Sequence, residues 1–261
     1  MANSSIRLLN LPSGRLSLRV AEAGEGRSYL LLHGGAGPRS MQALFDALAA
    51  TGKAILPTHP GFEGEDRPDW LSSVQQLAEC YVALLEEMNL GDVTIVGNSV
   101  GGWIAAEMGL LRSPRVGRIV LINAVGIDAD VSGNPIVDPM AVSSERRAAL
   151  AFHDPERFAI APKDPAGLAA MADNQRTLYT YAGEPFMHDP TLRSRLADLS
   201  LPTLILWGES DGIVDVEYGR RYAAAICGSR FKIIAQAGHF PQIERLGDVQ
   251  RHIAAFGSLC A

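Results

Sequence analysis

Residues 97–102 read GNSVGG and contain the pattern G-x-S-x-G around Ser99. The apolar run 92–98 that precedes Ser99 is typical of a buried strand, and residues 99–112 have helical spacing. A serine in so tight a strand-to-helix turn projects its hydroxyl out of the sheet, and the flanking glycines are needed because strand and helix crowd together there. The segment predicts Ser99 as a nucleophile; an ordinary glycine-rich turn is the alternative.

A serine hydroxyl needs a base to take its proton, and the base needs an acid to orient it. His239 follows the last apolar run, in a loop that faces the carboxyl ends of parallel strands, where catalytic groups gather. Asp211 stands at the carboxyl end of the preceding apolar run. We therefore expect His239 as the base and Asp211 as the orienting acid. Alternatives remain for both roles, His33 and His59 for the base and Glu209 and Asp215 for the acid.

Backbone donors for a developing oxyanion are expected from two places. The start of the helix after Ser99 puts the N–H of Val100 and a positive dipole end beside the attacked atom. Residues 33–37, HGGAG, form a glycine-rich loop that lets the main chain approach it closely. A dinucleotide loop is the competing interpretation, but from Gly35 the fingerprint requires glycine where Ser40 stands. The phosphate-loop and H-E-x-x-H metal signatures are absent from the sequence.

The elements that must position these residues alternate along the chain. Six short apolar runs predict strands buried on both faces, as in a parallel sheet: 28–34, 53–58, 92–98, 118–124, 202–208 and 231–237. Helical spacing marks the segments between them, 39–51, 72–89, 99–112, 215–227 and 243–256. Residues 6–10 and 15–22 flank a turn and predict an antiparallel hairpin. The pattern indicates an α/β fold with a mostly parallel central sheet, an N-terminal antiparallel hairpin and helices on both faces.

One long interval lacks a strand pattern. Between about residues 127 and 199 prolines separate short helical pieces such as 143–152 and 166–178. A structureless loop of this length is implausible inside a compact domain. We expect a helical lid at 127–199, inserted into a core made of residues 1–126 and 200–261.

Composition restricts the class of protein. The 261 residues have 23 Lys and Arg against 29 Asp and Glu, a formal charge of −6, so neither nucleic acid nor an anionic membrane is an expected partner. Cys80, Cys227 and Cys260 are widely spaced, which argues against disulfides and zinc. The first residues lack a secretory h-region, and no 18-residue apolar stretch occurs. We expect a cytoplasmic protein, and the sequence leaves a homodimer open.

Five segments together resemble the α/β-hydrolase superfamily over about residues 6–258: HGGAG (33–37), HPGFEG (59–64), GNSVGG (97–102), WGESDGIV (207–214) and GHFPQIE (238–244). The chain is most similar to the branch of serine esterases, meta-cleavage-product hydrolases and haloperoxidase-like enzymes. The resemblance implies Ser99, His239 and Asp211 as nucleophile, base and acid. It also implies an oxyanion hole of the Gly35 and Val100 N–H groups, the lid, and no cofactor.

Differences between this chain and other members of the superfamily exclude some activities and weaken others. Epoxide hydrolases and haloalkane dehalogenases of this plan have aspartate where Ser99 stands. Proline iminopeptidases typically have HGGPG and GGSWG, whereas this chain has HGGAG and GNSVG. His59 begins a segment where many relatives have Asp-x-Pro-Gly-x-Gly, so this histidine changes either the chemistry or only the loop.

The sequence thus predicts a metal-free serine hydrolase of small, mainly apolar carboxylic esters. An alternative keeps the same triad and cleaves a carbon–carbon bond, as meta-cleavage-product hydrolases do; a less favoured one is a ligand receptor with weak hydrolysis. The carbon–carbon reaction needs a cation for a substrate carboxylate, for which the insertion offers Arg146, Arg147, Arg157 and Arg176. Phe62, Trp103 and Phe240 lie near the motifs and are candidates for the substrate pocket, or for core.

Overall fold

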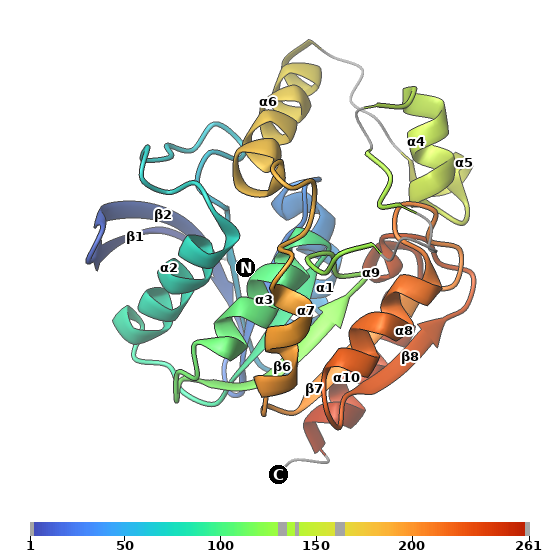
Figure 1. Ribbon diagram of the computed structural model, residues 1–261. Helices are drawn as coiled ribbons and strands as arrows, with labels where there is room; N and C mark the ends of the chain where they lie inside the picture. The colour runs from blue at the N-terminus through green and yellow to red at the C-terminus, as the bar shows by residue number, and fades with distance from the viewer. Residues whose placement is uncertain (1–2, 130–134, 139–140, 160–164, 259–261) are drawn as a thin grey trace.

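An eight-stranded sheet forms the centre of the protein in a computed structural model, which describes residues 3–129, 135–138, 141–159 and 165–258 (Figure 1). The strand order is β1-β2-β4-β3-β5-β6-β7-β8. β1 pairs antiparallel with β2, β2 pairs antiparallel with β4, and all other pairs are parallel. The strands are β1 Asn3–Leu11, β2 Gly14–Ala23, β3 Ser28–Leu32, β4 Lys53–Pro57, β5 Val93–Asn98, β6 Val116–Ile122, β7 Thr203–Gly208 and β8 Arg230–Ile234.

Burial along the strands follows their place in the sheet. All six residues of β5 and of β7 are buried, which is the property of strands covered on both faces. In β2 buried and exposed residues alternate, as expected where one face of the sheet is exposed to solvent. The predicted hairpin and mostly parallel sheet are therefore confirmed. The third strand ends at Leu32, two residues earlier than predicted, so His33 and Gly34 belong to the following loop.

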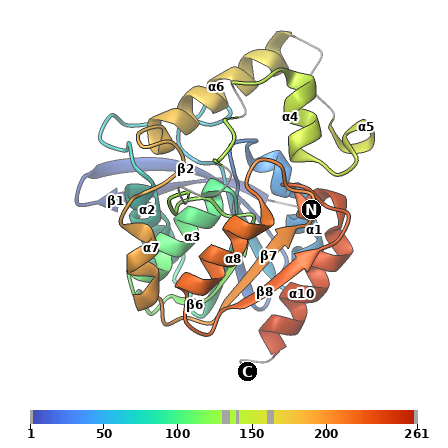
Figure 2. The same cartoon turned by 45° about the vertical axis from the view of Figure 1, so that its right-hand side comes forward.

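Helices cover both faces of the sheet (Figure 2). One apolar cluster contains residues of α2 (Val74–Glu87), α3 (Val100–Leu110) and α8 (Val216–Ala225), and the other contains residues of α1 (Gln42–Ala49) and α10 (Leu246–Ser258). Two predicted helices are divided. A 3-10 turn, η1 (Pro38–Met41), precedes α1, and the short α9 (Pro241–Glu244) precedes α10 because Arg245 leaves helical geometry. Ser73 and Gln76 start α2 with a capping box.

Between β6 and β7 the chain forms an insertion that contains α4 (Ser144–Ala151), α5 (Pro155–Phe158), α6 (Pro165–Ala182), α7 (Leu192–Arg195) and the 3-10 turn η2 (Leu196–Asp198). Helices α4, α5 and α6 lie beyond the ends toward which the parallel strands point (Figures 1 and 2). The sequence pattern missed α5 and α7, which are single turns. The domain boundaries at 127 and 199 stay a prediction.

The insertion is attached to the sheet body at its carboxyl-terminal side. Gly126 N–H donates to Met187 O at 3.0 Å, and Asp189 N–H donates to Gly126 O at 2.9 Å. Arg195 holds the carboxylate of Glu107 on α3 with two bonds of 2.7 and 2.8 Å. Among the described residues no helix is long and apolar enough to cross a membrane.

Candidate active site

Ser99 lies in the turn between β5 and α3 with φ 56° and ψ −121°. A left-handed φ is costly for a residue with a side chain, so the surrounding structure must enforce it. The glycines around Ser99 are required by close contacts. A Cβ on Gly97 would lie 2.1 Å from the carbonyl oxygen of Gly101, and a Cβ on Gly101 would lie 2.1 Å from that of Leu32. The sequence GNSVG therefore builds the tight, strained turn that its pattern predicts.

Asp211 follows β7 and is 5% exposed. Its Oδ1 accepts the backbone N–H groups of Ile213 and Val214 at 2.8 and 3.1 Å. Its Oδ2 accepts the Asn123 amide at 2.5 Å and the His239 ring at 2.8 Å. Four donors thus fix the carboxylate in one orientation, with one oxygen toward the predicted base.

His239 is 4% exposed and is oriented at both ends. Because the carboxylate of Asp211 only accepts, Nδ1 of His239 carries the proton and Nε2 is left with a lone pair. The backbone N–H of His239 donates to Ala151 O at 2.7 Å. This tautomer is the one a base must have to take a proton from a serine.

The rival residues have other partners. Asp215 accepts the Tyr218 N–H and starts α8, and Glu209 accepts the Gln236 N–H. His33 and His59 are buried together under the glycine-rich loop, where their rings stack with centroids 3.7 Å apart. None of the four contacts the His239 ring through a described hydrogen bond.

Two asparagines that the sequence analysis did not single out hold these loops together. Asn98 donates both amide protons, to Ile122 O and to His239 O, each at 3.1 Å, so the residue before Ser99 joins the turn between β5 and α3 to the loop of His239. Asn123 donates to Asp211 and accepts the Gly208 N–H at 3.2 Å. Only their positions in the sequence could have indicated this role, because Asn98 ends one buried strand and Asn123 directly follows another.

Of the two predicted oxyanion donors, Val100 directly follows Ser99, and Gly35 follows a residue that lies next to it. Val100 is the first residue of α3, so its N–H has no partner within the helix and points out of the positive end of the dipole. Gly34 is next to Ser99: a Cβ on Gly34 would lie 2.9 Å from that of Ser99. Gly35 therefore follows a residue that contacts the serine. The assignment of the two N–H groups as an oxyanion hole stays a prediction.

The three candidate pocket residues lie in different surroundings. Phe62 is 1% exposed and packs edge-on against His33 and His59. Trp103 is 3% exposed and donates its indole N–H to Glu107. Phe240 is partly exposed and lies beside His239, with ring centroids 5.2 Å apart. Phe62 and Trp103 thus have the surroundings of core residues, and Phe240 as a pocket residue stays a prediction.

Helix α6 packs on the loop that carries His59. Thr177 donates to Gly61 O at 2.8 Å, and Tyr181 donates to Pro60 O at 2.9 Å. Leu178, between them on the same helix face, approaches Gly35 so closely that a Cβ there would lie 2.6 Å from Leu178 Cδ2. The insertion thus places an apolar side chain directly over the glycine-rich loop.

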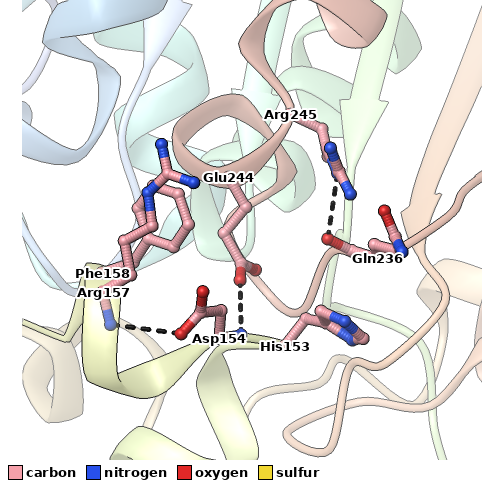
Figure 3. Close-up of a pocket in the computed structure, with 7 residues that line it drawn as sticks. All are labelled: His153, Asp154, Arg157, Phe158, Gln236, Glu244 and Arg245. Carbon is pink, nitrogen blue, oxygen red and sulfur yellow. Dashed lines mark hydrogen bonds between the residues drawn. The ribbon is translucent and has the colours of Figure 1, made fainter.

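The end of α4 contacts both loops that carry the acid and the base. Gly212 N–H donates to Leu150 O at 2.9 Å, next to the His239 bond to Ala151. Beside this junction a cavity of about 220 Å³ is lined by residues of the insertion and of the segment 236–245 (Figure 3). In it Glu244 accepts the N–H of Asp154 at 3.0 Å and that of Gly238 at 2.6 Å. The insertion and the histidine loop are joined through this carboxylate.

None of the four insertion arginines named as candidate cations makes a described hydrogen bond or ion pair with the loops of Ser99, Asp211 and His239. Arg146 and Arg157 are exposed, Arg147 is half-buried on α4, and the Arg176 side chain is 75% exposed beside Asp173. Within the ranges that the structure describes, no group of three His, Cys, Asp or Glu side chains is placed to hold a metal ion.

The sequence profile of the alpha/beta hydrolase family matches residues 29–249, most of the chain. The chain belongs to the alpha/beta hydrolase family. This alpha/beta hydrolase is 27% identical to 2-hydroxy-6-oxononadienedioate/2-hydroxy-6-oxononatrienedioate hydrolase 2 of Pseudomonas putida, over 97% of this chain and 96% of that protein.

Solved structures confirm the alpha/beta-hydrolase fold. A thermophilic esterase from Thermogutta terrifontis aligns with a TM-score of 0.80 at 20% identity, over 99% of both chains. A meta-cleavage product hydrolase from Pseudomonas fluorescens aligns with a TM-score of 0.79 at 21% identity, over 98% of both chains. At these identities the structural similarity shows the fold alone, so the substrate of this hydrolase must be argued from the residues of its site.

Proposed function

We propose that this alpha/beta hydrolase cleaves small, mainly apolar carboxylic esters through Ser99, His239 and Asp211. The observation that supports this most is the Asp211–His239 hydrogen bond of 2.8 Å, in a loop that Asn98 ties to the turn of Ser99. This bond leaves Nε2 of His239 with the lone pair that a base needs.

In the first half-reaction Ser99 Oγ attacks the ester carbonyl carbon as its proton passes to His239 Nε2. Asp211 stabilises the resulting imidazolium, and the N–H groups of Gly35 and Val100 bind the oxyanion. Collapse of the tetrahedral intermediate breaks the ester bond, and His239 returns the proton to the departing alkoxide. In the second half-reaction His239 takes a proton from water, whose oxygen attacks the acyl carbon. Collapse of this second tetrahedral intermediate breaks the bond to Ser99 Oγ, which takes the proton from His239 as the acid departs.

Carbon–carbon hydrolysis by the same three residues is the second candidate, and the full-length similarity to the dienedioate hydrolase of Pseudomonas putida favours it. A dienedioate has carboxylates that need a cationic contact. The side chains described beside the glycine-rich loop and beside His239, Leu178 and Phe240, are apolar and offer no such contact. For this reason we place the ester reaction first.

The test compares wild type and Ser99→Ala on a p-nitrophenyl short-chain ester and on a 2-hydroxy-6-oxo-dienoate. Ester turnover that exceeds dienoate turnover, and that Ser99→Ala abolishes, supports the first proposal. The reverse preference supports carbon–carbon cleavage. Activity of Ser99→Ala close to wild type on both substrates would sink the assignment of the nucleophile.

We also propose a cytoplasmic location. Cys80 and Cys227 are free in the structure, and unpaired cysteines suit a reducing compartment. Cys260 lies outside the described residues.

A further inference from the structure

His33 and His59 form a buried pair beneath the glycine-rich loop, and the three bonds between them and the backbone fix where their protons lie. The backbone N–H of His59 donates to Nε2 of His33 at 3.0 Å, so that nitrogen has a lone pair. The other nitrogen of His33, Nδ1, therefore carries the proton and donates to the carbonyl of Gly34 at 2.8 Å. His33 is thus a neutral donor aimed at Gly34.

The tautomer of His59 is fixed in the same way, from the opposite side. Its Nε2 lies 2.9 Å from the carbonyl oxygen of His33, which only accepts, so Nε2 carries the proton. Its Nδ1 then has a lone pair, and the hydroxyl of Tyr81 donates to it. Tyr81 is fully buried on α2 and belongs to the sheet body.

The consequence for the site follows from the geometry of the peptide bond. The carbonyl of Gly34 and the N–H of Gly35 belong to one planar trans unit, so they point in opposite directions. Two donors hold that carbonyl, His33 Nδ1 at 2.8 Å and the Gly37 N–H at 3.1 Å. Fixing the oxygen of Gly34 therefore fixes the direction of the Gly35 N–H.

We propose that Tyr81, His59 and His33 are positioning residues that aim the Gly35 N–H at the oxyanion of the reaction, through a chain of hydrogen bonds that begins on α2. This inference rests on the proposed function, because it presumes that Gly35 donates to an oxyanion. It gives His59 a role that its place in the sequence did not reveal.

The surroundings favour the neutral form of both rings. Burial lowers the pKa of His59 from 6.5 to about 4, and burial together with the nearby His59 lowers the pKa of His33 well below its ordinary value. Phe62 packs edge-on against both rings and excludes water from them. Neither ring has solvent access through which it could exchange its partners for water.

The first test removes the far end of the chain. Tyr81→Phe deletes the hydroxyl that fixes His59 and leaves every residue that touches substrate unchanged. The matched control is Tyr218→Phe, which deletes a buried tyrosine hydroxyl on α8 that is bonded to Ile127 and not to His59 or His33. We expect Tyr81→Phe to lower kcat about 10-fold at nearly constant KM, because oxyanion donors act mainly in the transition state. Tyr218→Phe keeps kcat within about 2-fold of wild type.

The second test replaces the donor to Gly34 itself. Asparagine at position 33 places an amide N–H near the position of Nδ1, whereas leucine has no donor. We expect His33→Leu to lower kcat about 100-fold, approaching the loss of a whole oxyanion donor, and His33→Asn to recover about 10-fold of that. The affinity of a boronic acid inhibitor, whose oxygen occupies the oxyanion position, falls in parallel with kcat, and melting temperatures of all variants report on folding.

The outcomes separate this inference from the proposed function. If Ser99→Ala hydrolyses esters as well as wild type, the proposed function fails. If wild type is active through Ser99 but Tyr81→Phe matches Tyr218→Phe, or His33→Asn is no better than His33→Leu, only the positioning role fails. Nitrogen-15 NMR of wild type, with each histidine assigned by substitution, tests the hydrogen-bond chain without activity: we expect His33, like His239, to have its proton on Nδ1 and His59 to have it on Nε2. A proton on Nε2 of His33 would overturn the inference.

Discussion

Replacing Asp211 by asparagine tests the geometry of the acid more sharply than deleting it. The asparagine oxygen can keep the bonds that Oδ1 accepts from the backbone N–H groups of Ile213 and Val214. Its NH₂ group then occupies the position of Oδ2 and faces two donors, the amide of Asn123 and Nδ1 of His239. Asn123 cannot turn its oxygen inward without losing the Gly208 N–H. The ring of His239 must therefore change tautomer.

The size of the effect follows from that tautomer. With its proton on Nε2, His239 cannot accept a proton from Ser99, and kcat should fall by about 10⁴. This corresponds to about 5.5 kcal/mol in the activation barrier. Folding should suffer less, by about 1–3 kcal/mol, because only one buried acceptor is replaced by a donor. The assay is p-nitrophenyl ester hydrolysis for kcat and KM, with urea denaturation for stability.

Two variants serve as controls, since Glu209 and Asp215 are the neighbouring acids. Asp215→Asn and Glu209→Gln should keep kcat within about 3-fold of wild type, because their carboxylates accept backbone N–H groups away from the His239 ring. A kcat for Asp211→Asn within 10-fold of wild type, or a larger loss in either control, would refute the reasoning.

Three further predictions concern stability and specificity. Between pH 6.5 and 4 the unfolded chain binds a proton at His59 that the folded protein does not, so His59 alone should lower stability by about 2 kcal/mol from pH 7 to pH 5, and the buried His33 adds to this fall. In urea denaturation His59→Gln should lose about 2 kcal/mol less than wild type over this range, and a fall equal to that of wild type would contradict the prediction. Arg195→Met leaves the buried carboxylate of Glu107 without its ion pair and should lower the free energy of unfolding by about 2–4 kcal/mol, whereas an unchanged urea midpoint would show that the pair contributes nothing. Leu178→Ala removes the side chain that lies over Gly35, so it should raise kcat/KM for esters of branched or longer acids, relative to acetate esters, by about 10-fold. Leu168→Ala is the control: Leu168 is exposed on the same helix, and its loss should leave the acyl preference unchanged.

The sheet could be predicted from the sequence because each of its buried strands has a recognisable pattern of residues. A strand buried on both faces is a continuous apolar run, and β5 and β7 are wholly buried. The end of β3 was less predictable, since His33 continues the apolar run but turns its ring toward His59. In the insertion, α6 was recognised only in part, and the one-turn helix α5 has too few residues to show a period.

The candidate site was predictable where a local motif constrains the backbone, and less so where contacts join distant segments. The tight turn at Ser99 could be recognised from the glycines around it. Asn98 could not, because its role lies in a bond to His239, 141 residues away in the chain. His59 was ambiguous for the same reason: its partners, His33 and Tyr81, come from two other elements.

The most direct test of the central claim is covalent labelling by a fluorophosphonate, followed by peptide mapping of the adduct. The reagent reacts only with a serine whose proton a neighbouring base can take. We predict one adduct per chain, on Ser99, which is lost in Ser99→Ala and strongly slowed in Asp211→Asn. An adduct on another residue, or labelling at the wild-type rate in Asp211→Asn, would contradict the account.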